Sequence, residues 1–376
     1  MKINILKKPY KISIIIGTRP EAIKLASLII SFKKNKTFKT RIILTGQHKE
    51  MVTQVMNIFN LKSDINFEIM KENQSLDEIT IKIMKSLKKE FEINKPDLVI
   101  VQGDTTSSFV GALAAFYQKI PIAHLEAGLR TDNIYNPFPE EINRRLISQI
   151  ATLHFAPTDT ALKNLSKSRA MGEIHKTGNT VIDTLYLAVN KKSKIDIQNY
   201  GLEKNKFILC TIHRRENWGA KLESITMALQ KILEINKEIK IIFPMHKNKV
   251  IRKSFIKILG NNPRAILAEP LGYIDLISIM KKSLILITDS GGLQEEAPSL
   301  GKPVVVVRET TERQESIDCG ASILVGTETD NIVKGVNELI NNKEKYNSMS
   351  KTINPYGDGK ASERIIKICD KYLSNL

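Results

Sequence analysis

Two loops in this sequence combine glycine with cationic or hydroxyl side chains in a way that suits a phosphate group. The segment GTRPEAIK follows an apolar run, and it carries Arg19 and Lys24 where a helix is expected to begin. A second segment, DSGG, also follows an apolar run, and Ser290, Gly291 and Gly292 can offer consecutive backbone N–H groups to an anion. Neither segment has the GxxxxGKS/T pattern of a Walker loop or the GxGxxG pattern of a dinucleotide-binding loop. Taken alone, the first segment fits an ordinary strand-to-helix turn equally well. The prediction of anion binding therefore depends on the two segments together.

Three acidic loops and one basic loop carry further charged side chains, each after an apolar run or at the expected start of a helix. Asp104 lies in GDTTS, Glu126 in HLEAGLRT and Glu140 in PFPEE. Carboxylates at strand ends can act as general acids or bases, although Asp104 can equally be a helix cap. His213 begins HRREN, where two following arginines favour contact with phosphate. Glu296, one turn into the helix expected after DSGG, can accept hydrogen bonds from ribose hydroxyls or simply favour the start of that helix.

Short β-branched runs alternate with helix-period segments, which predicts an α/β fold with parallel sheets covered on both faces. Strands are expected at residues 12–16, 41–44, 98–101, 120–125 and 153–156, and again at 207–211, 239–244, 265–267, 284–288 and 303–307. The pattern restarts after a connection that contains Gly172. We therefore predict two Rossmann-like, doubly wound domains, residues 1–171 and 172–359, with the active site in the cleft between them.

Composition narrows the choice of function. The chain has 376 residues, 42% of them hydrophobic and 26% charged, which suits two globular domains. The net charge is 57 − 40 = +17, but the lysines are spread along the chain and not interleaved with aromatic residues, so we expect a solvated basic surface and no nucleic-acid partner. The three cysteines lack metal-site or disulfide spacing. No apolar run approaches roughly 18 residues and the N-terminus lacks signal-peptide anatomy, so we expect a cytoplasmic protein without a membrane span.

The order of these segments resembles one enzyme family. Along the chain stand GTRPEAIK, TGQHKEM, GDTTS, HLEAGLRT, PFPEEINRR, GNTVIDTL, HRREN, DSGGLQEEAPSLGKP, TTERQE and NPYGDG. From residue 12 to about residue 370 this succession resembles the non-hydrolysing UDP-N-acetylglucosamine (UDP-GlcNAc) 2-epimerases. The resemblance implies the GT-B architecture, in which a C-terminal helix, here residues 360–376, returns to the first domain. It also implies a homodimer that uses neither a metal nor a nicotinamide cofactor.

The resemblance implies a reaction and a set of site residues. The family interconverts UDP-GlcNAc and UDP-ManNAc, which supply cell-surface polysaccharide synthesis, by eliminating UDP to leave 2-acetamidoglucal and then adding UDP back. The matching catalytic positions are Asp104, Glu126, Glu140 and His213, with the three carboxylates forming a shared acid–base set. The matching substrate-binding positions are Arg19, Lys24, Ser290, Gly291, Gly292, Glu296 and Arg313. Among these, Arg19, His213 and the glycine loop would hold the diphosphate, and Glu296 would hold the ribose.

Some bacterial members of the family also bind a second UDP-GlcNAc as an activator. The matching positions are Gln47, Glu50, Gln74, Arg214 and His246, with Glu140 nearby. Glutamate occupies position 50 where glutamine can occur, so activation is left open. Leu276 and Leu271 stand where some members have an aromatic residue and a glutamine around uracil, so aliphatic packing is expected to replace stacking.

Other enzymes are alternatives to this interpretation. A hydrolysing epimerase would release free ManNAc and UDP, and a related epimerase would act on a 2,3-diacetamido uronic acid nucleotide sugar. The segments GTRPEAIK and PEE favour the plain GlcNAc class. A retaining GT-B glycosyltransferase fits less well, because three carboxylate loops occupy the region where an acceptor site would be expected.

Overall fold

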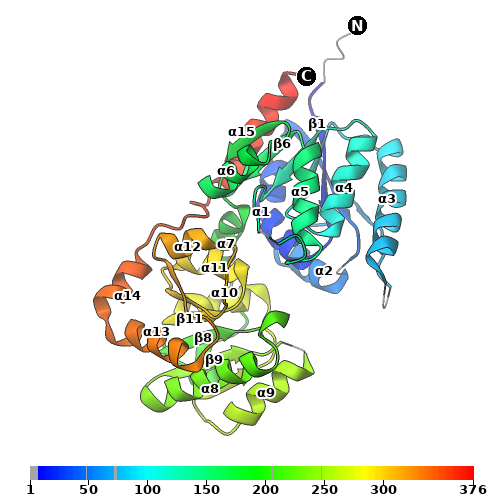
Figure 1. Cartoon of the computed structure of the whole chain (residues 1–376). Helices are drawn as coiled ribbons and strands as arrows, with labels where there is room; N and C mark the ends of the chain where they lie inside the picture. The colour runs from blue at the N-terminus through cyan, green and yellow to red at the C-terminus, as the bar shows by residue number, and fades with distance from the viewer. Residues whose placement is uncertain (1–6, 48, 72–73, 132, 205, 247) are drawn as a thin grey trace. The chain divides into compact units, whose positions relative to one another are not determined.

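The protein consists of two α/β units, each built on one parallel sheet (Figure 1). The computed structural model describes residues 7–47, 49–71, 74–131, 133–204, 206–246 and 248–376. Contacts divide the chain into unit 1, Met1–Tyr186 with Tyr356–Leu376, and unit 2, Leu187–Pro355. Every strand pair that the structure describes is parallel, and helices connect the strands. The predicted fold class is therefore confirmed.

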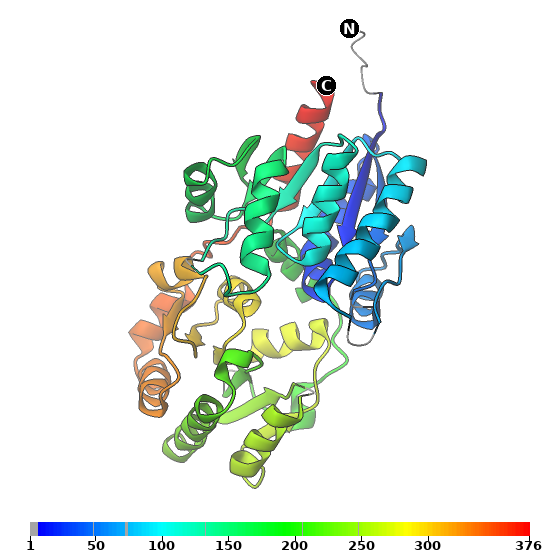
Figure 2. The same cartoon turned by 45° about the vertical axis from the view of Figure 1, so that its right-hand side comes forward.

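Unit 1 has a seven-stranded sheet in the order β3-β2-β1-β4-β5-β6-β7. Its strands are β1 (Tyr10–Ile16), β2 (Phe38–Leu44), β3 (Ile65–Asn66), β4 (Leu98–Gln102), β5 (Ile122–Leu125), β6 (Leu153–Ala156) and β7 (Glu173–Lys176). Its helices are α1 (Arg19–Lys34), α2 (Lys49–Ile58), α3 (Leu76–Ile93), α4 (Thr106–Tyr117), α5 (Glu140–Ile150), α6 (Asp159–Lys167), α7 (Thr180–Val189), which ends in unit 2, and α15 (Ala361–Ser374). Helices α3, α4 and α5 lie side by side over one face of the sheet (Figures 1 and 2), and α15 packs against α1.

Unit 2 has a six-stranded sheet in the order β10-β9-β8-β11-β12-β13. Its strands are β8 (Phe207–Thr211), β9 (Lys240–Pro244), β10 (Ala265–Ala268), β11 (Ile285–Thr288), β12 (Val304–Val306) and β13 (Ser322–Leu324). Its α-helices are α8 (Ala220–Ile235), α9 (Lys249–Leu259), α10 (Tyr273–Lys282), α11 (Gly291–Glu296), α12 (Gln314–Asp318), α13 (Thr329–Asn341) and α14 (Lys343–Ser350), and its 3-10 turns are η1 (Ile197–Tyr200), η2 (Arg215–Asn217) and η3 (Ala297–Leu300). Helices α8, α9 and α13 bury an apolar core against one face of the sheet.

The boundary between the units differs from the predicted one at residue 171. Unit 1 extends to Tyr186, so it includes β7 and most of α7. Gly172 suggested a linker, but a Cβ on it would lie 2.2 Å from the Thr152 carbonyl oxygen, and the next residue, Glu173, donates its N–H to that oxygen at 2.8 Å. This glycine therefore permits a close approach within the first sheet.

Three strands were missed by the sequence prediction, and all of them lie at sheet edges. Strand β3 has two residues, β13 has three, and β7 has no buried residue. Prediction relied on apolar runs, which arise where a strand is covered on both faces. Short or half-exposed edge strands do not produce that pattern.

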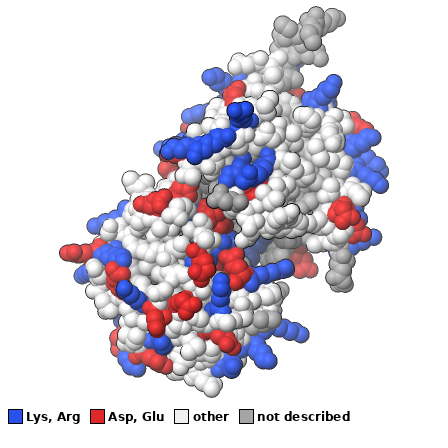
Figure 3. Space-filling view, viewed as in Figure 1, with Lys and Arg blue, Asp and Glu red and all other residues white. Residues whose placement is uncertain are grey.

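On the face drawn in Figure 3, acidic side chains are interspersed among the basic ones in each unit. No described helix is long and apolar enough to cross a membrane. Within the same described ranges, no three His, Cys, Asp or Glu side chains are grouped to hold a metal ion.

Two histidines are buried in the sheet of unit 1. His124 in β5 and His154 in β6 have no exposed surface, and their ring centroids lie 6.3 Å apart. Nε2 of His124 donates to the Gly103 carbonyl at 2.7 Å, and Nε2 of His154 donates to the Met171 carbonyl at 2.6 Å. Burial lowers the pKa of both rings, that of His124 to about 3. Both rings are therefore neutral at pH 7.

We predict that the protein loses stability as the pH falls below the unfolded histidine pKa of about 6.5, because the unfolded chain then binds protons that folded His124 does not. The free energy of unfolding should fall by about 1.4 kcal/mol per pH unit for this residue down to about pH 4. Urea denaturation at several pH values measures the slope. His124→Gln should flatten it, whereas His175→Gln, at a partly exposed histidine of β7, should not. Equal slopes in the parent and His124→Gln would contradict the prediction.

Candidate functional site

The charged loops of unit 1 meet where the winding of its sheet reverses, between the neighbouring strands β1 and β4. Arg19 opens α1 after β1, and Asp104 follows β4. Gly17 is needed after β1 because a Cβ there would lie 2.2 Å from Oγ of Ser107 in α4. Ser107 donates to Oε1 of Gln47 at 2.8 Å, so this predicted activator contact lies beside the same loops.

Glu21 joins the two loops, a role that the sequence did not reveal. Its side chain is buried, with 3% exposed. Oε2 accepts the N–H groups of Gly17 at 2.9 Å and Thr18 at 2.5 Å, and Oε1 lies 2.6 Å from the hydroxyl groups of both Thr105 and Ser108. Burial raises the pKa of Glu21, and these hydrogen bonds oppose that effect. One carboxyl group therefore ties the end of β1 to the end of β4.

Asp104 is held by two residues of α5. Nη2 of Arg144 lies 2.5 Å from Oδ2 of Asp104, and Nδ2 of Asn143 donates to the Asp104 carbonyl oxygen at 2.9 Å. The Arg144 side chain is buried, whereas Asp104 keeps part of its surface exposed. A guanidinium at this distance makes a charge-assisted hydrogen bond that fixes the carboxylate. Neither Arg144 nor Asn143 was predicted as a site residue.

The two glutamates of PFPEE have different environments. Glu141 is fully buried, and its carboxylate binds Nε of Arg145 at 2.6 Å and the backbone N–H of Thr131 at 3.0 Å. Glu140 is the first residue of α5 and is partly exposed. Glu141 is therefore a structural acid, and Glu140 is the member of the pair that remains accessible for chemistry.

Glu126 forms the third acidic position of unit 1. It has a left-handed backbone conformation, with φ of 56°, directly after β5. Its side chain is 5% exposed; Oε1 pairs with Nζ of Lys24, and Oε2 accepts a hydrogen bond from Nε2 of Gln102 at 2.6 Å. Lys24, predicted to bind substrate, thus contacts a predicted catalytic carboxylate.

In unit 2 the corresponding reversal lies between β8 and β11, and His213 and Asp289 follow these strands. Asp289 is fully buried, and it accepts the backbone N–H groups of His213 at 3.1 Å and Arg214 at 2.9 Å. Nδ1 of His213 lies 3.2 Å from Asp289, so this nitrogen carries the proton and Nε2 can accept one. Burial lowers the pKa of His213, Asp289 opposes the effect, and Arg214 adds to it.

The predicted phosphate loop has limited space at one glycine and open space at the next. A Cβ on Gly291 would lie 3.3 Å from Cζ of Arg313 and 3.3 Å from Oε1 of Glu312. A Cβ on Gly292 would meet only Oγ of Ser290, at 4.0 Å. Arg313, which was predicted from another loop, is therefore beside the glycine loop.

Buried partners hold the other predicted side chains of unit 2. The Tyr273 hydroxyl donates to Oε1 of Glu296 at 2.5 Å, and both residues are buried. Nε of Arg313 donates to Oε1 of Glu295 at 2.8 Å. Sequence reasoning missed Tyr273 and Glu295, because each pairing joins separate segments of the chain and leaves no local pattern.

The remaining predicted activator contacts are divided between the units. In unit 1, Glu50 is exposed in the first turn of α2, and Oε1 of Gln74 accepts the Lys71 N–H at 3.1 Å. In unit 2, Nη2 of Arg214 lies 3.0 Å from Oε1 of Glu312, and the His246 ring stacks 6.5 Å from that of His213.

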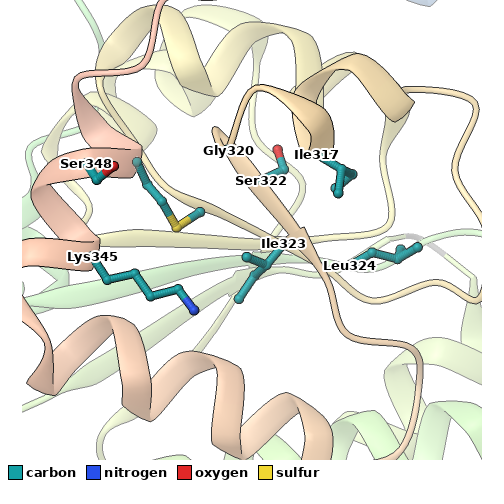
Figure 4. A pocket seen from close by; sticks show the side chains of 8 residues that line it. Ile317, Gly320, Ser322, Ile323, Leu324, Lys345 and Ser348 are labelled. Atoms are coloured by element: carbon teal, nitrogen blue, oxygen red, sulfur yellow. The ribbon is translucent and has the colours of Figure 1, made fainter.

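A cavity of about 480 Å³ in unit 2 contains none of the predicted site residues. It lies along the edge strand β13, where side chains from α12, β13 and α14 surround it (Figure 4). Ile323, Leu324 and Met349 give it apolar walls. The cavity is therefore separate from the strand ends where the charged loops gather.

We predict that the pair formed by Lys24 and Glu126 is strongly coupled, because both side chains are largely buried. Lys24→Met should lower the free energy of unfolding at pH 8 by about 3 kcal/mol, since it leaves Glu126 charged without its cation. The double variant Lys24→Met, Glu126→Gln should recover most of that loss, and urea denaturation of the four proteins in the cycle measures the coupling. Additive losses in the double variant would show that the two groups do not depend on each other.

Comparison with known proteins gives one family for the whole chain. A family model described as UDP-N-acetylglucosamine 2-epimerase matches residues 30–370. The UDP-N-acetylglucosamine 2-epimerase of Campylobacter jejuni is 47% identical over 377 residues, covering 97% of this chain and 98% of that protein. The corresponding protein of Bacillus subtilis is 44% identical over 361 residues, covering 96% of this chain and 95% of that protein.

Solved structures agree with the sequence matches. The UDP-GlcNAc 2-epimerase of Neisseria meningitidis, bound to UDP-GlcNAc, has a TM-score of 0.87 and 44% identity, and the match covers 96% of this chain and all of that one. The S. aureus MnaA structure with UDP has a TM-score of 0.90 and 43% identity, and the match covers 98% of each chain. The resemblance inferred from the sequence segments is confirmed: this chain belongs to the UDP-N-acetylglucosamine 2-epimerase family.

Proposed function

We propose that this protein is a non-hydrolysing epimerase that interconverts UDP-GlcNAc and UDP-ManNAc. The observation that carries the proposal is the set of carboxylates at the strand ends of unit 1, where Asp104 is paired with Arg144 and Glu126 with Lys24. Related structures with bound UDP-GlcNAc or UDP support the choice of substrate.

The reaction must remove a C2 proton that no neighbouring carbonyl group acidifies. In the proposed mechanism a carboxylate takes this proton while the bond between C1 and the UDP oxygen breaks. The electron pair of the C–H bond forms the C1–C2 double bond of 2-acetamidoglucal, and the pair of the C–O bond leaves with UDP. An acid then protonates the opposite face of C2, and UDP adds back to C1. Electrons balance without an oxidant, so the reaction needs no redox cofactor.

In this proposal unit 2 holds the nucleotide. The backbone N–H groups of Ser290, Gly291 and Gly292 bind the diphosphate, together with His213. Arg19 keeps the phosphate-binding role that the family resemblance gave it. Arg313, which lies beside Gly291, binds a phosphate or sugar group. Glu296, already oriented by Tyr273, accepts the ribose hydroxyls. Donors fixed around the diphosphate stabilise the negative charge that develops on it as the C1–O bond breaks.

Unit 1 supplies the acid–base groups. Asp104, Glu126 and Glu140 share the proton transfers, and Arg144 and Lys24 orient the first two. His213, with Nδ1 directed at Asp289, can take up a proton at Nε2, and the protonated ring then donates to the diphosphate as the C1–O bond breaks. Activation by a second UDP-GlcNAc through Gln47, Glu50, Gln74, Arg214 and His246 stays a prediction, and so does the homodimer.

We predict that incubation with UDP-GlcNAc in deuterated water places deuterium at C2 of both UDP-GlcNAc and UDP-ManNAc, because the C2 proton leaves and is replaced. NMR of the recovered nucleotide sugars measures the exchange. Epimerisation without deuterium at C2 would contradict the mechanism. Accumulation of free ManNAc in place of UDP-ManNAc would identify a hydrolysing enzyme.

A second prediction separates proton transfer from binding. Asp104→Asn, Glu126→Gln and Glu140→Gln keep the side-chain shapes, so each variant should bind UDP within a small factor of the parent. Turnover should fall by about 10² to 10⁴ for each true acid or base, measured as conversion of UDP-GlcNAc. Glu92→Gln is a control at an exposed carboxylate of α3. If all three variants turn over at the parental rate, these carboxylates do not carry the chemistry.

A further inference from the structure

Glu312 lies among three arginines in the loop after β12. Nη1 of Arg308 lies 2.8 Å from Oε2 of Glu312, while Nη2 of Arg214 and Nη1 of Arg313 lie 3.0 Å and 3.1 Å from Oε1. The side chain is 11% exposed. Burial alone would raise the pKa of Glu312, but Arg313, Arg214 and Arg308 together hold it well below its usual range. Glu312 is therefore an anion at any pH near neutrality.

The Glu312 carboxylate also lies against the glycine loop. A Cβ built on Gly291 would be 3.3 Å from Oε1 of Glu312 and equally close to the guanidinium carbon of Arg313. The same carboxylate oxygen accepts a hydrogen bond from Arg214 and forms an ion pair with Arg313. An anion of the protein itself thus lies beside the backbone that is proposed to receive the diphosphate.

The charges of this cluster cancel. Arg214, Arg308 and Arg313 carry three positive charges. Glu312 carries one negative charge, and two further carboxylates pair with the arginines: Glu216 with Nε of Arg308 at 2.7 Å and Glu295 with Nε of Arg313 at 2.8 Å. A diphosphate approaching Gly291 therefore meets arginines whose charge is already compensated. Its phosphate oxygens must compete with a carboxylate for the same guanidinium N–H groups.

We propose that Glu312 is an internal counter-anion that competes with the diphosphate for Arg313, and thereby limits how tightly and for how long UDP is held. The inference rests on the proposed function, because it takes UDP as the ligand of the glycine loop. An epimerase of this kind must keep UDP while the glycal exists and must release the finished nucleotide sugar afterwards. When the phosphate leaves, the Glu312 carboxylate pairs with the arginines again. This pairing opposes rebinding of UDP and shortens the time for which UDP stays bound.

Glu312→Gln tests this directly, because the amide keeps the shape of the side chain and removes its charge. Calorimetric titration should show about tenfold tighter binding of UDP. This gain corresponds to one charge-assisted hydrogen bond that the diphosphate makes without competition from Glu312. Stopped-flow dissociation of UDP should slow by a similar factor of about ten. Uridine, which has no phosphate, should bind the variant and the parent equally.

Glu216→Gln is the matched control. It removes one negative charge from the same cluster, but Glu216 pairs with Arg308, is 38% exposed and is not among the atoms nearest a Cβ on Gly291. Its UDP affinity should stay within about twofold of the parent, because Glu216 does not lie against the glycine loop and solvent screens its partly exposed carboxylate. If Glu312→Gln does not fold, Glu312→Asp, which keeps the charge but is one methylene shorter, should still bind UDP more tightly than the parent.

Two outcomes would overturn the proposal, and they differ from a failure of the proposed function. Equal or weaker UDP binding by a folded Glu312→Gln variant would show that Glu312 orients the arginines and does not compete. An equal gain in Glu216→Gln would show a general effect of net charge. If the parent binds neither UDP nor UDP-GlcNAc, the proposed function itself fails.

Discussion

Pairing of buried cations with carboxylates near the ends of parallel strands is the constraint on which this structure depends. Arg144 binds Asp104, Lys24 binds Glu126, and Arg313 binds Glu295. Buried charges are tolerated only when they are paired and hydrogen-bonded. The pairs therefore stabilise loops that would otherwise expose or misplace their charges, and they also fix the directions in which these groups act.

The topology of the sheets makes these pairs possible. Both sheets reverse their winding next to the first strand of the unit, between β1 and β4 and between β8 and β11. The loops that follow these strands need close backbone approaches, as at Gly17, and buried hydrogen-bond acceptors, as at Glu21 and Asp289. These acceptors contact backbone N–H groups, so they position the loops and leave the chemistry to neighbouring side chains.

The sequence predicts much of this arrangement, for physical reasons that also explain what it misses. Central strands produce apolar runs in the sequence, and the charged loops after them can be located because polar residues interrupt those runs. No such pattern marks the edge strands β3 and β7. None marks Arg144 and Tyr273, the partners of Asp104 and Glu296, either. Arg144 and Tyr273 act on residues that are distant in the sequence, and a pairing of that kind depends on the folded chain. Individual catalytic roles came from the family resemblance and not from spacing.

The central claim is that the bond between C1 and the UDP oxygen breaks while the protein retains UDP. Positional isotope exchange tests it most directly. UDP-GlcNAc is prepared with ¹⁸O in the oxygen that bridges C1 and the β-phosphorus, and the nucleotide sugars are recovered after partial reaction. Rotation of the β-phosphate of retained UDP should move the label into non-bridging positions of both UDP-GlcNAc and UDP-ManNAc. Epimerisation with all of the label still in the bridge would contradict the account.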